Sequence, residues 1–196
     1  SWNVTSTELT WKNNVVEIND HALANAYKTE FEEMWGGSGD SPNPSLAKCG
    51  VQKLDNTPHF FNIGGRDIRL YFSPSDATNS KIVDAVYSSQ HNIYFALYAF
   101  TRSDIATAMN QRYLGGVTDI RGLIDQINTT GSQWTYLNTF AEMFAANENT
   151  QHHKYAIFDA SYSGSDPTTV TGSHNWSNSA EQDNDENTLI IRDIYV

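Results

Sequence analysis

Polar and apolar residues are arranged along this chain in the pattern of strands that alternate with helices. Residues 15–20 have the composition of a short strand. Residues 21–35 repeat apolar side chains every three or four positions, which predicts a helix with Asn19 or Asp20 as its N-terminal cap. The stretch 36–45 is rich in Gly, Ser and Pro, so we expect the helix to end there in a loop.

The same alternation continues towards the C-terminus. The apolar run at 92–100 predicts a strand that is covered on both faces, whereas 133–149 is expected to be mostly helix or loop. Further strands are predicted at 59–72, as a pair joined by Gly64 and Gly65, at 117–125 and at 152–159, with helices starting after 73 and 101. This order is typical of an α/β fold, an α-β-α sandwich around a mixed β-sheet.

The first twenty residues resemble a later stretch, 173–193, when one gap is allowed. We therefore expect 1–36 to be the strand–helix tail of an upstream repeat, 37–58 to be a linker and 59–196 to be one catalytic repeat. The aligned pairs are Ser1 with Ser173, Asn3 with Asn175, Asn14 with Asn187 and Asp20 with Asp193, while Asn13 stands where the second copy has Glu186.

Composition narrows the classes of function. The formal net charge of −11 argues against a tight, non-specific grip on nucleic acid, which needs clustered Lys and Arg. No apolar run is long enough to predict a membrane span. Asn, Ser and Thr are abundant while Lys and Arg total 12, a balance that favours a secreted or periplasmic protein. The single Cys49 cannot form a disulfide within the chain.

Two pairs of polar residues suggest a phosphate site. His152 and Lys154 stand two residues apart in the predicted strand 152–159, a spacing that places both side chains on one face. Ser173 and Asn175 have the same spacing on what reads as an adjacent strand. A lysine cation with neutral hydroxyl and carboxamide donors can hold the non-bridging oxygens of a phosphate. We therefore expect substrate binding by Lys154, Ser173 and Asn175.

Two acidic residues accompany these pairs. Glu186 lies on the turn into the last predicted strand, where its carboxylate could accept a hydrogen bond from Nδ1 of His152 and leave Nε2 to react. Asp159 points to the opposite face of its strand from His152, so an orienting or structural role is favoured for it. His153 faces away as well, and we expect it not to be catalytic.

These residues form a recognisable series: His152, Lys154 and Asp159 in H-x-K-x4-D, then Gly172, Ser173 and Asn175 in G-S-x-N, then Glu186. The series resembles the phospholipase D superfamily, whose members are called HKD proteins. The resemblance covers nearly the whole chain, and the stretches 68–109 and 173–191 are similar to bacterial HKD endonucleases. It implies the fold described above and a catalytic set of His152, Lys154, Asp159, Ser173, Asn175 and Glu186.

The resemblance also implies a mechanism. One neutral histidine attacks phosphorus to form a phosphohistidine, and a second histidine protonates the leaving oxygen and then activates water. No metal or other cofactor is implied. This chain holds one complete motif, so the second histidine is expected from a homodimer mate or from an upstream repeat.

Three functions agree with this pattern. The first is a metal-independent phosphodiesterase of the endonuclease type, acting on DNA or RNA. The second is a phospholipase D or phosphatidyl transferase that uses the same site on a lipid headgroup. The third is a non-catalytic binding module that keeps the fold. The net charge of −11 counts against both enzymes, because both substrates are anionic.

Overall fold

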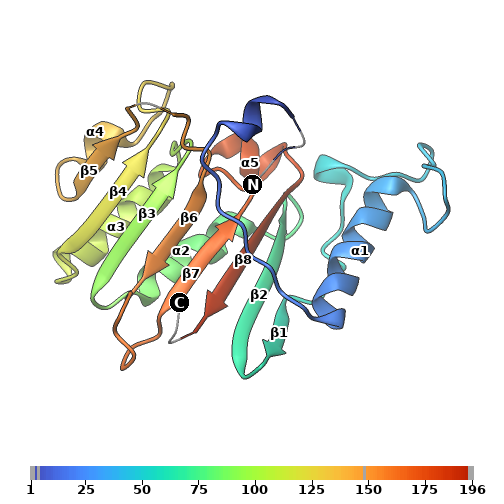
Figure 1. Cartoon of the computed structure of the whole chain (residues 1–196), viewed down its shortest axis with the longest axis horizontal. Helices are drawn as coiled ribbons and strands as arrows, with labels where there is room; N and C mark the ends of the chain where they lie inside the picture. The colour runs from blue at the N-terminus through green and yellow to red at the C-terminus, as the bar shows by residue number, and fades with distance from the viewer. Residues whose placement is uncertain (1–2, 4, 148, 194–196) are drawn as a thin grey trace.

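Eight strands form one mixed sheet in the computed structural model, which describes residue 3 and residues 5–147 and 149–193 (Figure 1). Their order across the sheet is β1-β2-β8-β7-β6-β3-β4-β5. The neighbours β3, β4 and β5 are parallel, and the other pairs are antiparallel. The strands are β1 (Phe60–Ile63), β2 (Arg66–Ser73), β3 (Asn92–Leu97), β4 (Asp119–Ile124), β5 (Glu142–Ala145), β6 (Lys154–Phe158), β7 (Thr168–Gly172) and β8 (Glu186–Arg192).

The first long helix begins and ends where the sequence predicts. The side chain of Asp20 accepts a hydrogen bond of 2.8 Å from the backbone N–H of Leu23, so Asp20 and not Asn19 is the cap. The helix ends at Gly36, whose φ of 83° is a conformation that glycine adopts without strain. The helices are α1 (His21–Trp35), α2 (Thr78–Ser88), α3 (Ser103–Leu114), α4 (Trp134–Leu137) and α5 (Asn178–Gln182), with 3-10 turns η1 (Thr7–Leu9) and η2 (Gly50–Gln52).

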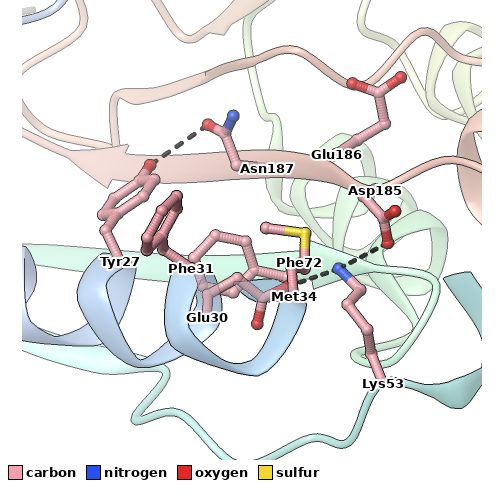
Figure 2. A pocket seen from close by; sticks show the side chains of 9 residues that line it. All are labelled: Tyr27, Glu30, Phe31, Met34, Lys53, Phe72, Asp185, Glu186 and Asn187. Atoms are coloured by element: carbon pink, nitrogen blue, oxygen red, sulfur yellow. Dashed lines mark hydrogen bonds and ion pairs between the residues drawn. The ribbon is translucent and has the colours of Figure 1, made fainter. Parts of the chain in front are cut away.

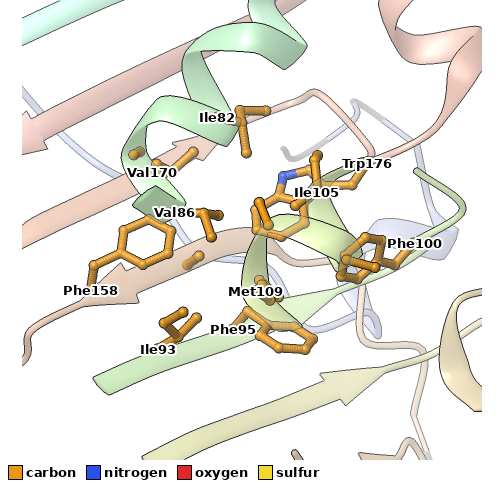
Figure 3. Packing of buried hydrophobic residues seen from close by; sticks show 14 of the residues in the cluster. Ile82, Val86, Ile93, Phe95, Phe100, Ile105, Met109, Phe158, Val170 and Trp176 are labelled. Atoms are coloured by element: carbon orange, nitrogen blue, oxygen red, sulfur yellow. The ribbon is translucent and has the colours of Figure 1, made fainter. Parts of the chain in front are cut away.

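The main core lies between one face of the sheet and the helices α2 and α3 (Figure 3). Burial of such apolar side chains is the chief force that holds these layers together. The helices contribute Ile82, Val86, Ile105 and Met109, and the strands contribute Ile93, Phe95, Phe158 and Val170.

A smaller core on the opposite face fixes α1 to the sheet. Leu23 and Ala26 of α1 pack against Leu70 of β2 and Leu189 of β8. The helix therefore covers the β1-β2-β8 side and leaves the second face of β3 to β6 without a helix, where Tyr94 is partly exposed and Phe144 is 50% exposed. The strand predicted at 92–100 is nevertheless buried along β3 except at Tyr94, so the expected cover on both faces is confirmed for most of this strand.

Two further expectations, a strand at 15–20 and a strand that carries Ser173 and Asn175, need correction. Residues 15–20 form no strand, because they run beside the sheet without pairing with it (Figure 1). Strand β6 begins only at Lys154, and β7 ends at Gly172, so Ser173 and Asn175 follow a strand and do not lie on one. The region 133–149 contains α4 and also the edge strand β5. Ser1, which the internal alignment pairs with Ser173, lies outside the described residues.

The fold otherwise follows the predicted order of elements. Two strands flank Gly64 and Gly65, and helices follow β2 and β3 as expected. The α/β class with a mixed sheet is confirmed. In the described ranges, no helix is long and apolar enough to cross a membrane.

Candidate active site

Four of the expected site residues, His152, Lys154, Ser173 and Glu186, lie at one end of the three neighbouring strands β6, β7 and β8. The start of β6 lies beside the end of β7, and the end of β7 lies beside the start of β8, because these pairs are antiparallel. His152 and Lys154 therefore reach the same edge as Ser173 and Glu186. The N-terminal segment crosses this edge as well (Figure 1).

The imidazole of His152 is held in a buried setting. The side chain lies against the rings of Trp11 and Tyr98, each with a centroid separation of 5.0 Å. Its Nδ1 atom is 3.3 Å from Oε1 of Glu8 and 3.2 Å from Oδ1 of Asn13. Both neighbouring atoms are oxygens that accept hydrogen bonds. The amide nitrogen Nδ2 of Asn13 already donates to the carboxylate of Glu8. Nδ1 therefore carries a proton, so in the neutral imidazole the lone pair is on Nε2.

Glu8 is the residue that the sequence analysis missed. Its carboxylate is buried and accepts hydrogen bonds from Nδ2 of Asn3, at 2.9 Å, and from Nδ2 of Asn13, at 2.7 Å. These two donors compensate the burial of the charge and fix its direction towards His152. The internal repeat gave a partial signal, because it aligned Asn13 with the glutamate expected to contact an imidazole.

Lys154 is a buried cation beside the histidine. Its ammonium donates a hydrogen bond of 3.0 Å to the backbone carbonyl of His152 and lies 5.1 Å from the centroid of the Tyr98 ring. Burial lowers the pKa of Lys154 to about 8, against the opposing effect of the nearby carboxylates of Glu186, Glu8 and Asp125. Lys154 is thus charged at neutral pH and placed to attract an anionic phosphate.

The glycine of G-S-x-N permits a close approach of two strands. Gly172 has a φ of 156°, and a Cβ atom there would lie 2.0 Å from the backbone oxygen of Asn187. The backbone N–H of Ser173 donates to that oxygen at 3.0 Å, and the hydroxyl of Ser173 accepts from the backbone N–H of Asn187 at 3.0 Å. This exchange fixes the position of the Ser173 hydroxyl.

Asn175 and His174 are separated from Ser173 by the bend that follows β7. Asn175 lines a different cavity, together with Thr101 and Gly131. Its buried Oδ1 atom has no hydrogen-bond partner among the described residues. His174 is buried, and its Nε2 lies 3.4 Å from a carboxylate oxygen of Glu181. The structure therefore does not bring Ser173 and Asn175 into one cavity.

Glu186 occupies a different place from the one expected. Its carboxylate accepts from Nδ2 of Asn184 at 3.1 Å, and Glu8 and Asn13 take the position beside Nδ1 of His152. Its charge still acts on the site, since it opposes the loss of the proton from Lys154. Orientation of His152 thus comes from the N-terminal segment.

Asp159 lies at the far end of β6 from His152. Its buried carboxylate accepts hydrogen bonds from the backbone N–H groups of Gln90, His91 and Asn92, with its closest contact 2.7 Å from His91. These amides belong to the turn into β3. The geometry agrees with the structural role that the sequence favoured over direct participation.

His153 faces away from the site, as expected. Its Nδ1 lies 3.3 Å from Oδ1 of Asn14, and its ring contacts Tyr155. Burial lowers the pKa of His153, with smaller contributions from nearby positive groups that include Lys154. Its neutral form is therefore favoured, outside the cluster around Lys154.

One group of described residues has the spacing of a metal site, and it contains none of the expected site residues. Asp55, His59 and Asp76 hold potential ligand atoms close together. His59 already contacts the backbone oxygen of Leu70 through Nδ1 at 2.9 Å, and Asp76 accepts from the backbone N–H of Phe72 at 2.7 Å. These internal contacts give the group a structural role at the turn after β2.

Comparison with known protein families identifies the domain that contains these residues. A family model described as the PLD-like domain of cardiolipin synthase matches residues 82–194, which is more than half of the chain and contains His152, Lys154, Ser173 and Glu186. The chain belongs to the PLD-like domain family. Members of the phospholipase D superfamily cleave phosphodiester bonds, and the PLD-like domain here carries the buried His152 and Lys154 described above.

Individual relatives support the same assignment. Mitochondrial cardiolipin hydrolase of Mus musculus is 28% identical over 123 residues, which are 61% of this chain and 52% of that protein. The chain thus spans about half the length of this relative.

Solved structures of the superfamily share the fold. Nuc from Salmonella typhimurium, a phospholipase D family member, superposes with a TM-score of 0.55 and 26% identity over 66% of this chain and 84% of its own. NucT from Helicobacter pylori superposes with a TM-score of 0.58 and 22% sequence identity, over 66% of this chain and 87% of its own. The PLD-like domain is therefore present, while α1 and the N-terminal segment lie outside the family match at 82–194.

Replacement of Glu8 by Gln should lower turnover by roughly 10- to 100-fold, the usual effect of a partner that orients a functional histidine. The substitution removes a negative charge that favours the protonated imidazole, so the histidine limb of the pH–rate profile should move to lower pH. Glu17→Gln, at an exposed position of the same segment, is the matched control. An unaltered profile in Glu8→Gln would show that Glu8 does not act on His152.

The rate on an anionic substrate should fall as the pH rises past about 8, where Lys154 loses its proton. A guanidinium stays charged throughout this range, so Lys154→Arg should lack the alkaline limb even though its rate is reduced. Lys81→Arg, on α2, should retain the limb. A wild-type profile that is flat to pH 10 would contradict the role of the ammonium.

Proposed function

We propose that this chain is a metal-independent phosphodiesterase that hydrolyses nucleic acid through a phosphohistidine intermediate. The observation that carries the proposal is the buried His152, whose Nδ1 faces Glu8 and Asn13, beside the buried ammonium of Lys154. A histidine held in one tautomer beside a cation suits attack on a phosphate anion better than a structural role at a strand end.

The steps follow from this geometry. Nε2 of His152 attacks phosphorus and forms a P–N bond while the P–O bond to the leaving group breaks. A second histidine donates its proton to the leaving oxygen. That histidine then removes a proton from water, whose oxygen attacks phosphorus and breaks the P–N bond. Lys154 and the hydroxyl of Ser173 would stabilise the charge on the non-bridging oxygens.

The second histidine would come from another HKD motif. The internal repeat aligns Asn13 with Glu186, and Asn13 contacts the imidazole of His152. A pseudo-two-fold arrangement would place Glu186 against the histidine of the other motif in the same manner. This placement suits the histidine of an upstream repeat, because in a second copy of this chain Nδ1 of His152 already faces Glu8 and Asn13. The other motif would belong to a second copy of this chain or to an upstream repeat.

The choice of nucleic acid rests on the resemblance of 68–109 and 173–191 to bacterial HKD endonucleases. The specific observation in favour of a lipid is the similarity to a protein named cardiolipin hydrolase. Both substrates contain an anionic phosphodiester, which the same histidine and lysine could process. The experiment must therefore offer both classes of substrate to the same preparation.

The first test measures hydrolysis of single-stranded oligonucleotides and of cardiolipin vesicles in EDTA. We expect cleavage of the oligonucleotide, a loss of roughly 10³-fold or more in His152→Ala and near wild-type activity in His153→Ala. Both variants are checked by circular dichroism. Activity that requires a divalent ion would refute metal independence, and cleavage confined to cardiolipin would establish the lipid enzyme. A rate in His152→Ala equal to that of the wild type would refute the catalytic role of His152, and a wild type that cleaves neither substrate would favour the binding module.

The second test measures the assembly state by sedimentation together with activity. An active homodimer is expected if the two motifs come from two copies. A mixture of wild-type and His152→Ala chains provides a control, because the shared site needs the histidine of both copies. Activity should therefore fall more steeply than the fraction of wild-type chains, since mixed dimers lack one of the two histidines. A strict monomer with full activity would refute the pairing.

A further inference from the structure

A cavity of about 230 Å³ lies between α1 and the start of β8, next to the candidate active site (Figure 2). Its walls include Glu186 and Asn187 at the beginning of β8 and the aromatic side of α1, where Figure 2 shows Tyr27 and Phe31 facing the strand. The family match begins at residue 82, so α1 contributes a wall that is outside the matched domain.

This cavity is continuous with the position of the phosphate-binding motif. Tyr27 and Asn187 also line a second cavity, of about 330 Å³, which includes Gly172 and Ser173. The hydroxyl of Tyr27 donates to Oδ1 of Asn187 at 3.2 Å, so the two cavities meet at this contact. A group attached to a phosphate at Ser173 can therefore extend along β8 towards α1.

The charges in the cavity exclude a second phosphate. Its one lysine, Lys53, is buried and forms ion pairs with Glu30 and, at 3.3 Å, with Asp185. Glu186 adds a further carboxylate to the wall. Among the described residues that line the cavity, acidic groups therefore outnumber basic groups, and the occupant must be neutral or cationic.

The remaining surface is aromatic and apolar. The side chain of Phe31 is 53% exposed, which is unusual for a large apolar residue beside a cavity. Its ring is stacked on Trp35 with centroids 5.3 Å apart, so the ring is supported from behind. Met34 and Phe72 complete the apolar wall. A rigid, exposed ring of this kind is a platform for a flat aromatic ligand.

We propose that this cavity binds a nucleobase that flanks the scissile phosphate, with the base stacked on Phe31 and its exocyclic amine directed at the carboxylate of Asp185. The proposal rests on the proposed nuclease function. The cavity is smaller than the roughly 300–1,000 Å³ that encloses drug-sized ligands, which suits a single base. An acyl chain offers no hydrogen-bond donor to the carboxylate of Asp185, whereas an exocyclic amine does.

The test compares a dinucleotide with two counterparts that lack the base on one or the other side of the phosphodiester. We expect the wild type to favour the complete dinucleotide over one counterpart by roughly 5- to 100-fold in kcat/KM, the range expected for one base–aromatic stack. Phe31→Ala should bring this ratio towards one, and Phe31→Trp should restore it. Phe60→Ala removes an equally exposed ring from β1 and should keep the wild-type ratio.

A binding measurement separates this proposal from the nuclease function. The fluorescence of a single-stranded oligonucleotide that contains 2-aminopurine should be quenched when the base stacks on the wild type or on Phe31→Trp. Phe31→Ala should leave the fluorescence unquenched. Cleavage at the same rate with and without the base, or quenching that persists in Phe31→Ala, would refute the proposed base-binding site. The proposed nuclease function would be unaffected by either result. Absence of both cleavage and quenching, with turnover of phosphatidylcholine that depends on Phe31, would overturn both and assign the cavity to a cationic headgroup.

Discussion

The contact between the carboxylate of Glu8 and the imidazole of His152 is the interaction on which the candidate site depends. It exists because the N-terminal segment is joined to the chain beside β6 by backbone hydrogen bonds of 2.9 Å, from Lys12 N–H to the carbonyl of Thr150 and from His152 N–H to the carbonyl of Lys12. These bonds fix Glu8 and Asn13 against Nδ1. A segment outside the family match thus determines the tautomer of the central residue.

Burial governs the electrostatics of the same region. The ammonium of Lys154 is removed from water, and the three carboxylates near it restore only part of the stability of its charge, so its pKa remains near 8. The buried carboxylate of Glu8 is compensated differently, by two carboxamide donors. The site therefore keeps the ammonium of Lys154 and the carboxylate of Glu8 close to His152, while the whole chain carries a net charge of −11.

The N-terminal segment and α1 act as one added layer on the sheet. The segment contacts β7 where Asn14 donates to Thr171 at 2.7 Å, and α1 packs on β2 and β8 through Leu23 and Ala26. This layer forms one wall of the groove that leads away from Ser173.

Local pattern determined the order of elements, a helix cap at Asn19 or Asp20 and the spacing of His152 and Lys154, because helix period, capping chemistry and strand alternation depend on neighbours in the chain. The order of the motif residues, from His152 to Glu186, could likewise be recognised from the sequence. The tertiary structure decided that 15–20 stays unpaired, that Ser173 and Asn175 diverge after Gly172, and that Glu8, not Glu186, faces His152. These outcomes depend on which distant backbone groups meet, such as Lys12 with His152, and such contacts between residues about 140 positions apart leave no local pattern.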